Sequence, residues 1–101
     1  MTVRLDAYDL KIVINGLFQT RAAFGKERQN EIEALVLRLI DTYERLKPGR
    51  RAKLCLDSGE ARLVLLCLNE WRNAFIRDGQ TEAAESVGDL MVRFARKTIE
   101  L

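Results

Sequence analysis

Few residues of this chain are of the types that carry out chemistry. The 101 residues include no histidine, and the only cysteines, Cys55 and Cys67, do not form a paired C-x-x-C arrangement. A structural zinc site and acid–base catalysis by histidine both need side chains that this sequence lacks. The sequence has no glycine-rich phosphate loop, no nucleophile spaced from a base, and no carboxylate cluster at metal-ligand spacing. We therefore predict that the chain is not an enzyme and holds no cofactor and no metal.

The densest positive charge lies in a connector without acidic residues. A basic loop of this kind can contact phosphates, and such binding weakens steeply with salt. The formal net charge of +2 is too small to indicate nucleic acid by itself, and no aromatic residues are interleaved with the cations. Two interpretations stay open: a solvated connector, or a weak contact site for nucleic acid or another anion. The cations are Arg45, Lys47, Arg50, Arg51 and Lys53.

One segment of the chain carries more apolar residues than a single helix face can bury. The segment from Leu63 to Leu68 is continuously apolar, so its helix either lies at the centre of the domain or leaves a surface for a second copy or another protein. Trp71 stands among amide and charged residues, where it is either a binding hot spot or packed on its own domain. The candidate interface residues are Phe18, Leu37, Leu63, Leu65, Leu66 and Trp71.

The elements that must position these residues occur twice. The chain matches itself at an offset of 51 residues without a gap, and the identical pairs include Leu17 with Leu68 and Phe24 with Phe75. Apolar residues with helical spacing run through both copies. Candidate helix boundaries agree with the repeat: Asp6 and Asp57 as N-caps of the first helices, Asn30 and Thr81 as N-caps of the second helices, and Gly25 and Gly79 in the connections between them.

These signals predict one all-α domain over residues 1–101. We expect a four-helix bundle built from two duplicated αα-hairpins related by an approximate twofold axis, because a hairpin of this length cannot bury enough surface alone. The first repeat covers about residues 5–46, the basic linker 47–53 and the second repeat about 56–97. The equivalent segments 2–5 and 53–56 are extended in character and are predicted to meet as a short strand pair.

Two arginines, Arg21 and Arg72, repeat at equivalent positions on the edge of the inward apolar stripe. A repeated inward arginine needs an acidic partner. One interpretation is an ion pair that fixes how the helices pack; the other is that both guanidinium groups face each other across the axis and hold an anionic ligand. The candidate partners are Glu31 or Glu82, and Asp9 or Glu60.

The expected location and function follow from these features. No apolar run is long enough to cross a bilayer, and the first residues lack the pattern of a secretory signal, so we predict a cytoplasmic protein with reduced cysteines. The predicted function is that of a small interaction or regulatory protein, which binds a second copy of itself or another protein through its helices. The alternative is weak binding of nucleic acid or anions through the basic linker.

Overall fold

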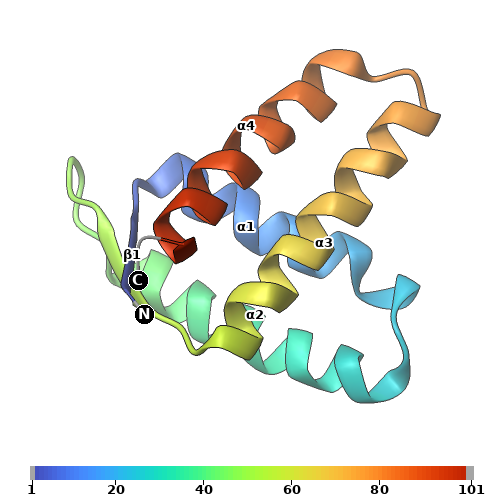
Figure 1. Cartoon of the computed structure of the whole chain (residues 1–101). Helices are drawn as coiled ribbons and strands as arrows, with labels where there is room; N and C mark the ends of the chain where they lie inside the picture. The colour runs from blue at the N-terminus through green and yellow to red at the C-terminus, as the bar shows by residue number, and fades with distance from the viewer. Residues whose placement is uncertain (1, 100–101) are drawn as a thin grey trace.

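The structure is a computed structural model that describes residues 2–99 and, of their side chains, those of residues 2–96. It is a mostly helical domain of four helices with a small two-stranded sheet (Figure 1). The elements in chain order are β1 (Thr2–Leu5), α1 (Ala7–Thr20), the 3₁₀ turn η1 (Arg21–Ala23), α2 (Lys26–Arg45), β2 (Ala52–Cys55), α3 (Ser58–Arg77) and α4 (Thr81–Ile99).

Both first helices begin at the predicted aspartates. The Asp6 carboxylate accepts a hydrogen bond of 2.8 Å from the backbone N–H of Asp9. The Asp57 carboxylate accepts one of 2.7 Å from the N–H of Glu60, and the Glu60 carboxylate accepts one of 3.0 Å from the N–H of Asp57. Each bond satisfies an N–H group that the helix leaves without a partner. The two expected N-caps are confirmed, and α3 carries the complete capping box.

The second helices begin at unequal positions. Helix α4 starts at Thr81, after the left-handed Gly79 (φ +75°) has ended α3, so Thr81 is the first helical residue and not the expected N-cap; the first helical hydrogen bond runs from the Ala84 N–H to the Gln80 carbonyl. The expectation that Asn30 caps the other second helix is wrong, because α2 already begins at Lys26 and Asn30 lies inside it. The reason lies in the first connection, where α1 ends at Thr20 and η1 reverses the chain early. Gly25 then caps the start of α2 instead of ending α1.

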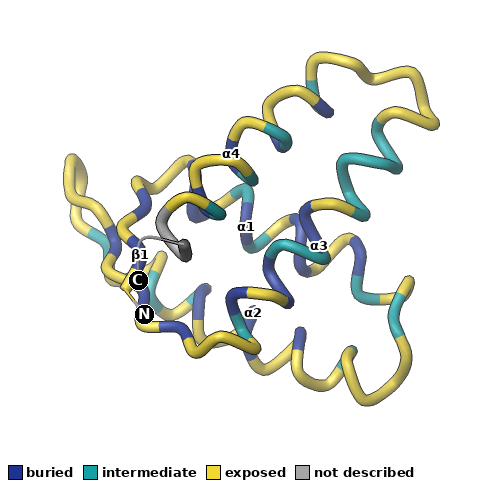
Figure 2. Tube along the Cα trace, in the orientation of Figure 1, coloured by how far each residue is buried: buried dark blue, intermediate teal, exposed yellow. Residues whose placement is uncertain are grey.

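The helices pack around a central crossing (Figure 1). Helices α1 and α3 cross each other, α2 packs on α1, and α4 packs on α3. Buried residues gather along these contacts and at the sheet, whereas the hairpin connections are mostly exposed (Figure 2). Phe94, Leu10, Leu17 and Leu90 are fully buried in this single core.

The crossing is close because Gly16 has no side chain. A Cβ atom at Gly16 would lie 2.9 Å from Cδ2 of Leu68 and 3.1 Å from Cε3 of Trp71, closer than carbon atoms normally approach. Next to this contact, the buried Thr20 hydroxyl donates a hydrogen bond of 2.7 Å to the carbonyl of Gly16. Thr20 lies beside the Cys67 thiol, whose pKa is raised above its ordinary value because it is buried, while Thr20 opposes that shift.

The two strands form the predicted pair. Strands β1 and β2 are antiparallel, with Val3 opposite Leu54 and Arg4 opposite Lys53. Val3 and Leu54 point into the core, whereas Arg4 and Lys53 point outward. The sheet therefore closes one end of the helical core and presents a polar outer face.

Candidate functional site

The predicted interface residues do not form one patch. Leu63 is buried, at 6% exposure, and Leu65 packs against the core as a partly buried residue, as expected for a central helix. Leu66 is also partly buried. Phe18 and Leu37 are exposed, but they lie on different helices, α1 and α2.

Trp71 lies at a hollow between the two hairpin connections. The first helix stops at Thr20, whereas α3 continues to Arg77, so the last turns of α3 extend past their neighbour. Every residue from Glu70 to Phe75 is partly exposed as a result. We call the hollow the tip groove. It has a volume of about 230 Å³ and is lined by Gln19, Thr20, Ala23, Glu70, Trp71, Ala74, Phe75 and Asp78.

Aromatic side chains lie in the tip groove and carboxylates at its rim. The rings of Trp71 and Phe75 lie 4.9 Å apart at an interplanar angle of 40°. Glu70 accepts a hydrogen bond of 3.3 Å from Arg77. Asp78 makes no ion pair with any residue of the described part of the chain. The groove can therefore take an apolar side chain that has a positive charge beside it.

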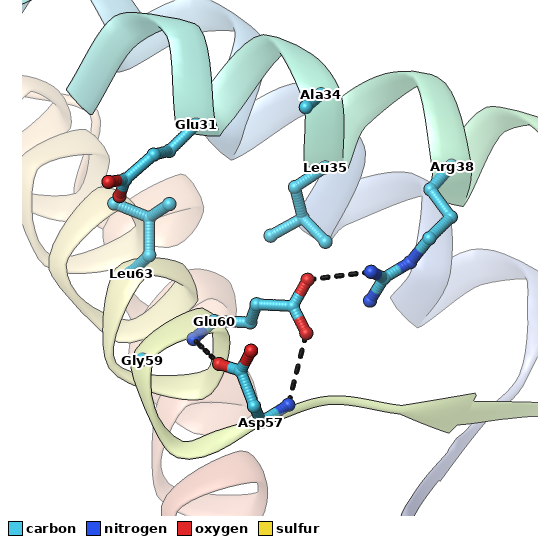
Figure 3. Close-up of a pocket in the computed structure, with 8 residues that line it drawn as sticks. All are labelled: Glu31, Ala34, Leu35, Arg38, Asp57, Gly59, Glu60 and Leu63. Atoms are coloured by element: carbon cyan, nitrogen blue, oxygen red, sulfur yellow. Dashed lines mark hydrogen bonds and ion pairs between the residues drawn. The ribbon is translucent and has the colours of Figure 1, made fainter. Parts of the chain in front are cut away.

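A larger hollow of about 560 Å³ separates α2 from the start of α3 (Figure 3). Arg38 reaches across it and donates a hydrogen bond of 2.6 Å to the Glu60 carboxylate, and a second bond of 3.3 Å to the carbonyl of Cys55. Glu60 uses its other oxygen for the capping box with Asp57. Because the central charges are already bonded to each other, this arrangement serves to join two helices and leaves little to bind a ligand.

A second arginine joins the other two helices. Arg93 of α4 donates hydrogen bonds of 2.6 Å and 3.3 Å to the two carboxylate oxygens of Asp9 in α1. The hydrogen bonds to Asp9 raise the pKa of Arg93 above its ordinary value. Asp9 and Glu60 thus find their partners on the second helix of the other hairpin. Arg38 and Arg93 were missed because nothing in the local sequence marks contacts over such separations.

Arg21 and Arg72 do not play the expected parts. The Arg21 side chain lies at the surface, over the Phe18 ring at 3.9 Å from its centroid, and it donates to the Phe18 carbonyl. Its acidic neighbour is Glu33, at 4.0 Å. Arg72 is half-buried against Gly88 of α4. The expected pairings with Asp9 or Glu60 are wrong, and each arginine packs within its own hairpin.

The basic connector is exposed, and strand pairing places one further cation beside it. Lys47, Arg50, Arg51 and Lys53 are exposed, and none makes an ion pair with a described residue. The strand register places Arg4 directly opposite Lys53. Arg45 differs, because it pairs with Asp41 at 3.3 Å on α2. We call Arg4, Lys47, Arg50, Arg51 and Lys53 the basic ribbon.

A scan against protein-family models, a search of curated proteins and a search of solved structures each find no match. Among the described residues, no group of three or more metal-ligating side chains comes together, and both cysteines are free thiols. No helix in the described part of the chain is long and apolar enough to cross a membrane. The tip groove and the basic ribbon therefore have to be judged on their own geometry.

Proposed function

We propose that the chain is a duplicated αα-hairpin whose halves are related by an approximate twofold axis. The sheet register supports this, because an offset of 51 residues turns the pair Thr2–Cys55 into the pair Arg4–Lys53 and the pair Val3–Leu54 into itself. The helix crossing supports it as well. The same offset turns the Gly16–Trp71 contact into the Cys67–Thr20 contact. The two arginine links across the hairpins start from equivalent carboxylates, Asp9 and Glu60.

We further propose that the protein is a non-enzymatic interaction protein that binds another protein at the tip groove. The carrying observation is the partly exposed aromatic face of α3, where Trp71, which packs on Gly16, and the neighbouring Phe75 both stay partly exposed and line the groove. Trp71, Ala74, Phe75 and Asp78 follow the spacing of one helix face, which is the arrangement of a surface that docks helices and short segments. A cytoplasmic location stays a prediction.

The size and charge of the groove favour a particular partner. About 230 Å³ is smaller than pockets that enclose drug-sized ligands, which measure roughly 300–1,000 Å³. It fits a single inserted side chain, as at the centre of a protein–protein contact. Asp78 and Glu70 at the rim favour a lysine or arginine beside the inserted residue. The partner segment we propose is therefore apolar with a basic neighbour.

A substitution that fills the groove tests this function. Trp71 also packs on Gly16, so its replacement would disturb the fold, whereas Ala74→Gln fills the groove and leaves the crossing intact. The measurement is quantitative capture of proteins from native lysate, with Ala34→Gln at the larger hollow as the matched control. We expect a protein captured by the wild type and by Ala34→Gln to be reduced about tenfold with Ala74→Gln.

Three results would contradict the proposal. The first is equal capture by both variants, which would place any contact elsewhere. The second is a wild-type dimer in sedimentation that Ala74→Gln dissociates, which would make a second copy of this chain the occupant of the groove. The third is a native lysate without any specific capture, which would leave the groove without a function in protein binding.

A further inference from the structure

The basic ribbon lies at the other end of the molecule from the tip groove (Figure 1). A turn runs from Lys47 to Arg50, and it is closed by a hydrogen bond of 3.1 Å that the Arg50 N–H donates to the Lys47 carbonyl. Within the turn, Gly49 takes the left-handed conformation (φ +77°). This turn leads directly into β2. Lys53 is therefore held in the sheet, while Lys47 and Arg50 lie at the two ends of the turn that precedes it.

The spacing of the charges is regular. Arg51 and Lys53 are two residues apart in an extended segment, so their Cα atoms are separated by about 6.6–6.8 Å along it. Arg4 lies across from Lys53 on the neighbouring strand, where directly opposed residues stand about 4.5–5.5 Å apart. The acids that follow the strands, Asp6 and Asp57, turn their carboxylates to helix N-termini. On the outer face of the sheet, Lys53 of β2 thus stands opposite Arg4 of β1, and Arg51 comes just before β2.

We propose that the basic ribbon binds the phosphate backbone of double-stranded nucleic acid. Four of its cations, Lys47, Arg50, Arg51 and Lys53, make no ion pair with a described residue. A nucleic-acid duplex offers them a dense and regular array of charge, about one phosphate per 1.7 Å of its axis. The outward residues of the strands are Thr2, Arg4, Lys53 and Cys55.

The same outward residues argue against other polyanions. None of the four is aromatic, so stacking of unpaired bases, which drives single-strand binding, has no support on this face. None is a large apolar side chain, so insertion into a lipid surface has none either. Contacts to phosphates alone carry no sequence information, so binding is independent of base sequence.

The test is a titration of a labelled DNA duplex followed by fluorescence anisotropy. With about four phosphates neutralised, we expect the affinity to fall roughly a hundredfold between about 50 and 200 mM salt. Two duplexes of unrelated sequence should bind equally, and a single strand of the same length should bind more weakly. The triple variant Arg50→Gln/Arg51→Gln/Lys53→Gln should bind at least about tenfold more weakly at low salt, and the slope of its remaining binding against salt should be smaller by about 2 to 3.

A matched variant distinguishes the effect of the basic ribbon on binding from the effect of net charge. Lys11→Gln/Arg28→Gln/Arg62→Gln removes the same charge from exposed helix positions that make no ion pair with a described residue. It should keep wild-type affinity to within about twofold to threefold, and circular dichroism should show both variants folded. Any one of four results would overturn the proposal. These are no wild-type binding at low salt, equal losses of affinity in both variants, tighter binding of the single strand than of the duplex, and tighter binding to phosphatidylserine vesicles than to the duplex. A negative result for the basic ribbon would not bear on the proposed protein binding at the tip groove.

Discussion

The two helical hairpins end their first helices in different ways and at different lengths. In the first, α1 ends at Thr20 and η1 reverses the chain; in the second, α3 runs on to Arg77 before a left-handed Gly79 ends it. The longer α3 extends beyond its neighbour and leaves Trp71 and Phe75 partly uncovered. The difference teaches that a groove with aromatic side chains can arise in a small helical domain from unequal helix ends, without any added element.

The hairpins also differ in how they fill the central crossing. On one side glycine faces tryptophan, at Gly16 and Trp71; on the other, cysteine faces threonine, at Cys67 and Thr20. A large side chain is thus matched by the absence of one, while two small side chains meet at the other contact. Because interiors are close-packed, each pair has to be changed as a unit.

The largest expected effect tests whether the central leucines are equivalent. Leu17→Ala and Leu68→Ala each remove a side chain that is at most 1% exposed, so each should lower the free energy of unfolding by about 2–5 kcal/mol. The measurement is urea denaturation followed by circular dichroism. Leu37→Ala, at a side chain with 70% exposure, serves as the control with a change within about 0.5 kcal/mol. A large loss at only one of the two leucines would break the comparison.

The next effect concerns the crossing itself. Gly16→Cys overpacks the contact with Trp71 and should cost about 1–3 kcal/mol, while Trp71→Thr leaves a void and should cost about 2–4 kcal/mol. The double variant reproduces the Cys67–Thr20 contact and should cost less than the two single changes together, by at least about 1 kcal/mol. Additive costs in a double-mutant cycle would show that the two contacts are not interchangeable.

A smaller difference is expected between the two arginine links. Asp9→Asn weakens two hydrogen bonds to Arg93 at a side chain only 9% exposed, and should cost about 1–3 kcal/mol. Glu60→Gln keeps a capping partner for Asp57 and affects a more exposed pair, so its cost should stay below about 1 kcal/mol. The measurement is thermal denaturation of both variants at the same pH. Equal losses of stability would contradict the expected difference between the two arginine links.

The smallest effect is a pH dependence from Cys67. Burial raises the pKa of this thiol above its ordinary value of 9.0, so above that pH the unfolded chain loses a proton that the folded chain retains. The free energy of unfolding should therefore fall as the pH rises through about 9. Cys67→Ala should flatten this dependence when both proteins are unfolded with urea at several pH values. An unchanged slope would assign the pH dependence to other groups.

Local signals in the sequence correctly predicted where the first helix of each hairpin begins. Asp6 and Asp57 act through backbone N–H groups three residues away, so their spacing alone identified both helix starts. The strand pair was predicted from the equivalence and extended character of its two segments and is confirmed, with β2 beginning one residue earlier than expected, at Ala52. Asn30 misled because it is a good N-cap by type, while tertiary packing of α1 decided where α2 begins.

The candidate sites were predicted less completely. The basic connector was visible as a run of charge, but Arg4 joins it only through strand pairing. Trp71 was noticed, whereas Phe75, Ala74 and Asp78 become its neighbours in a groove only because α1 stops early. Gly16 in the middle of a helix was the overlooked signal, since a glycine there costs helix stability unless something needs the space.

Trp71 is the only tryptophan in the chain, and it lies where the hairpins cross, next to Gly16. Its indole emission therefore reports on one defined place in the molecule without any attached dye. Separation of the hairpins would bring water to the ring and shift the emission to longer wavelength, whereas a segment docking beside it would exclude water and shift the emission to shorter wavelength. The protein thus contains its own optical probe, which distinguishes unfolding from occupation of the groove by the direction of the spectral change.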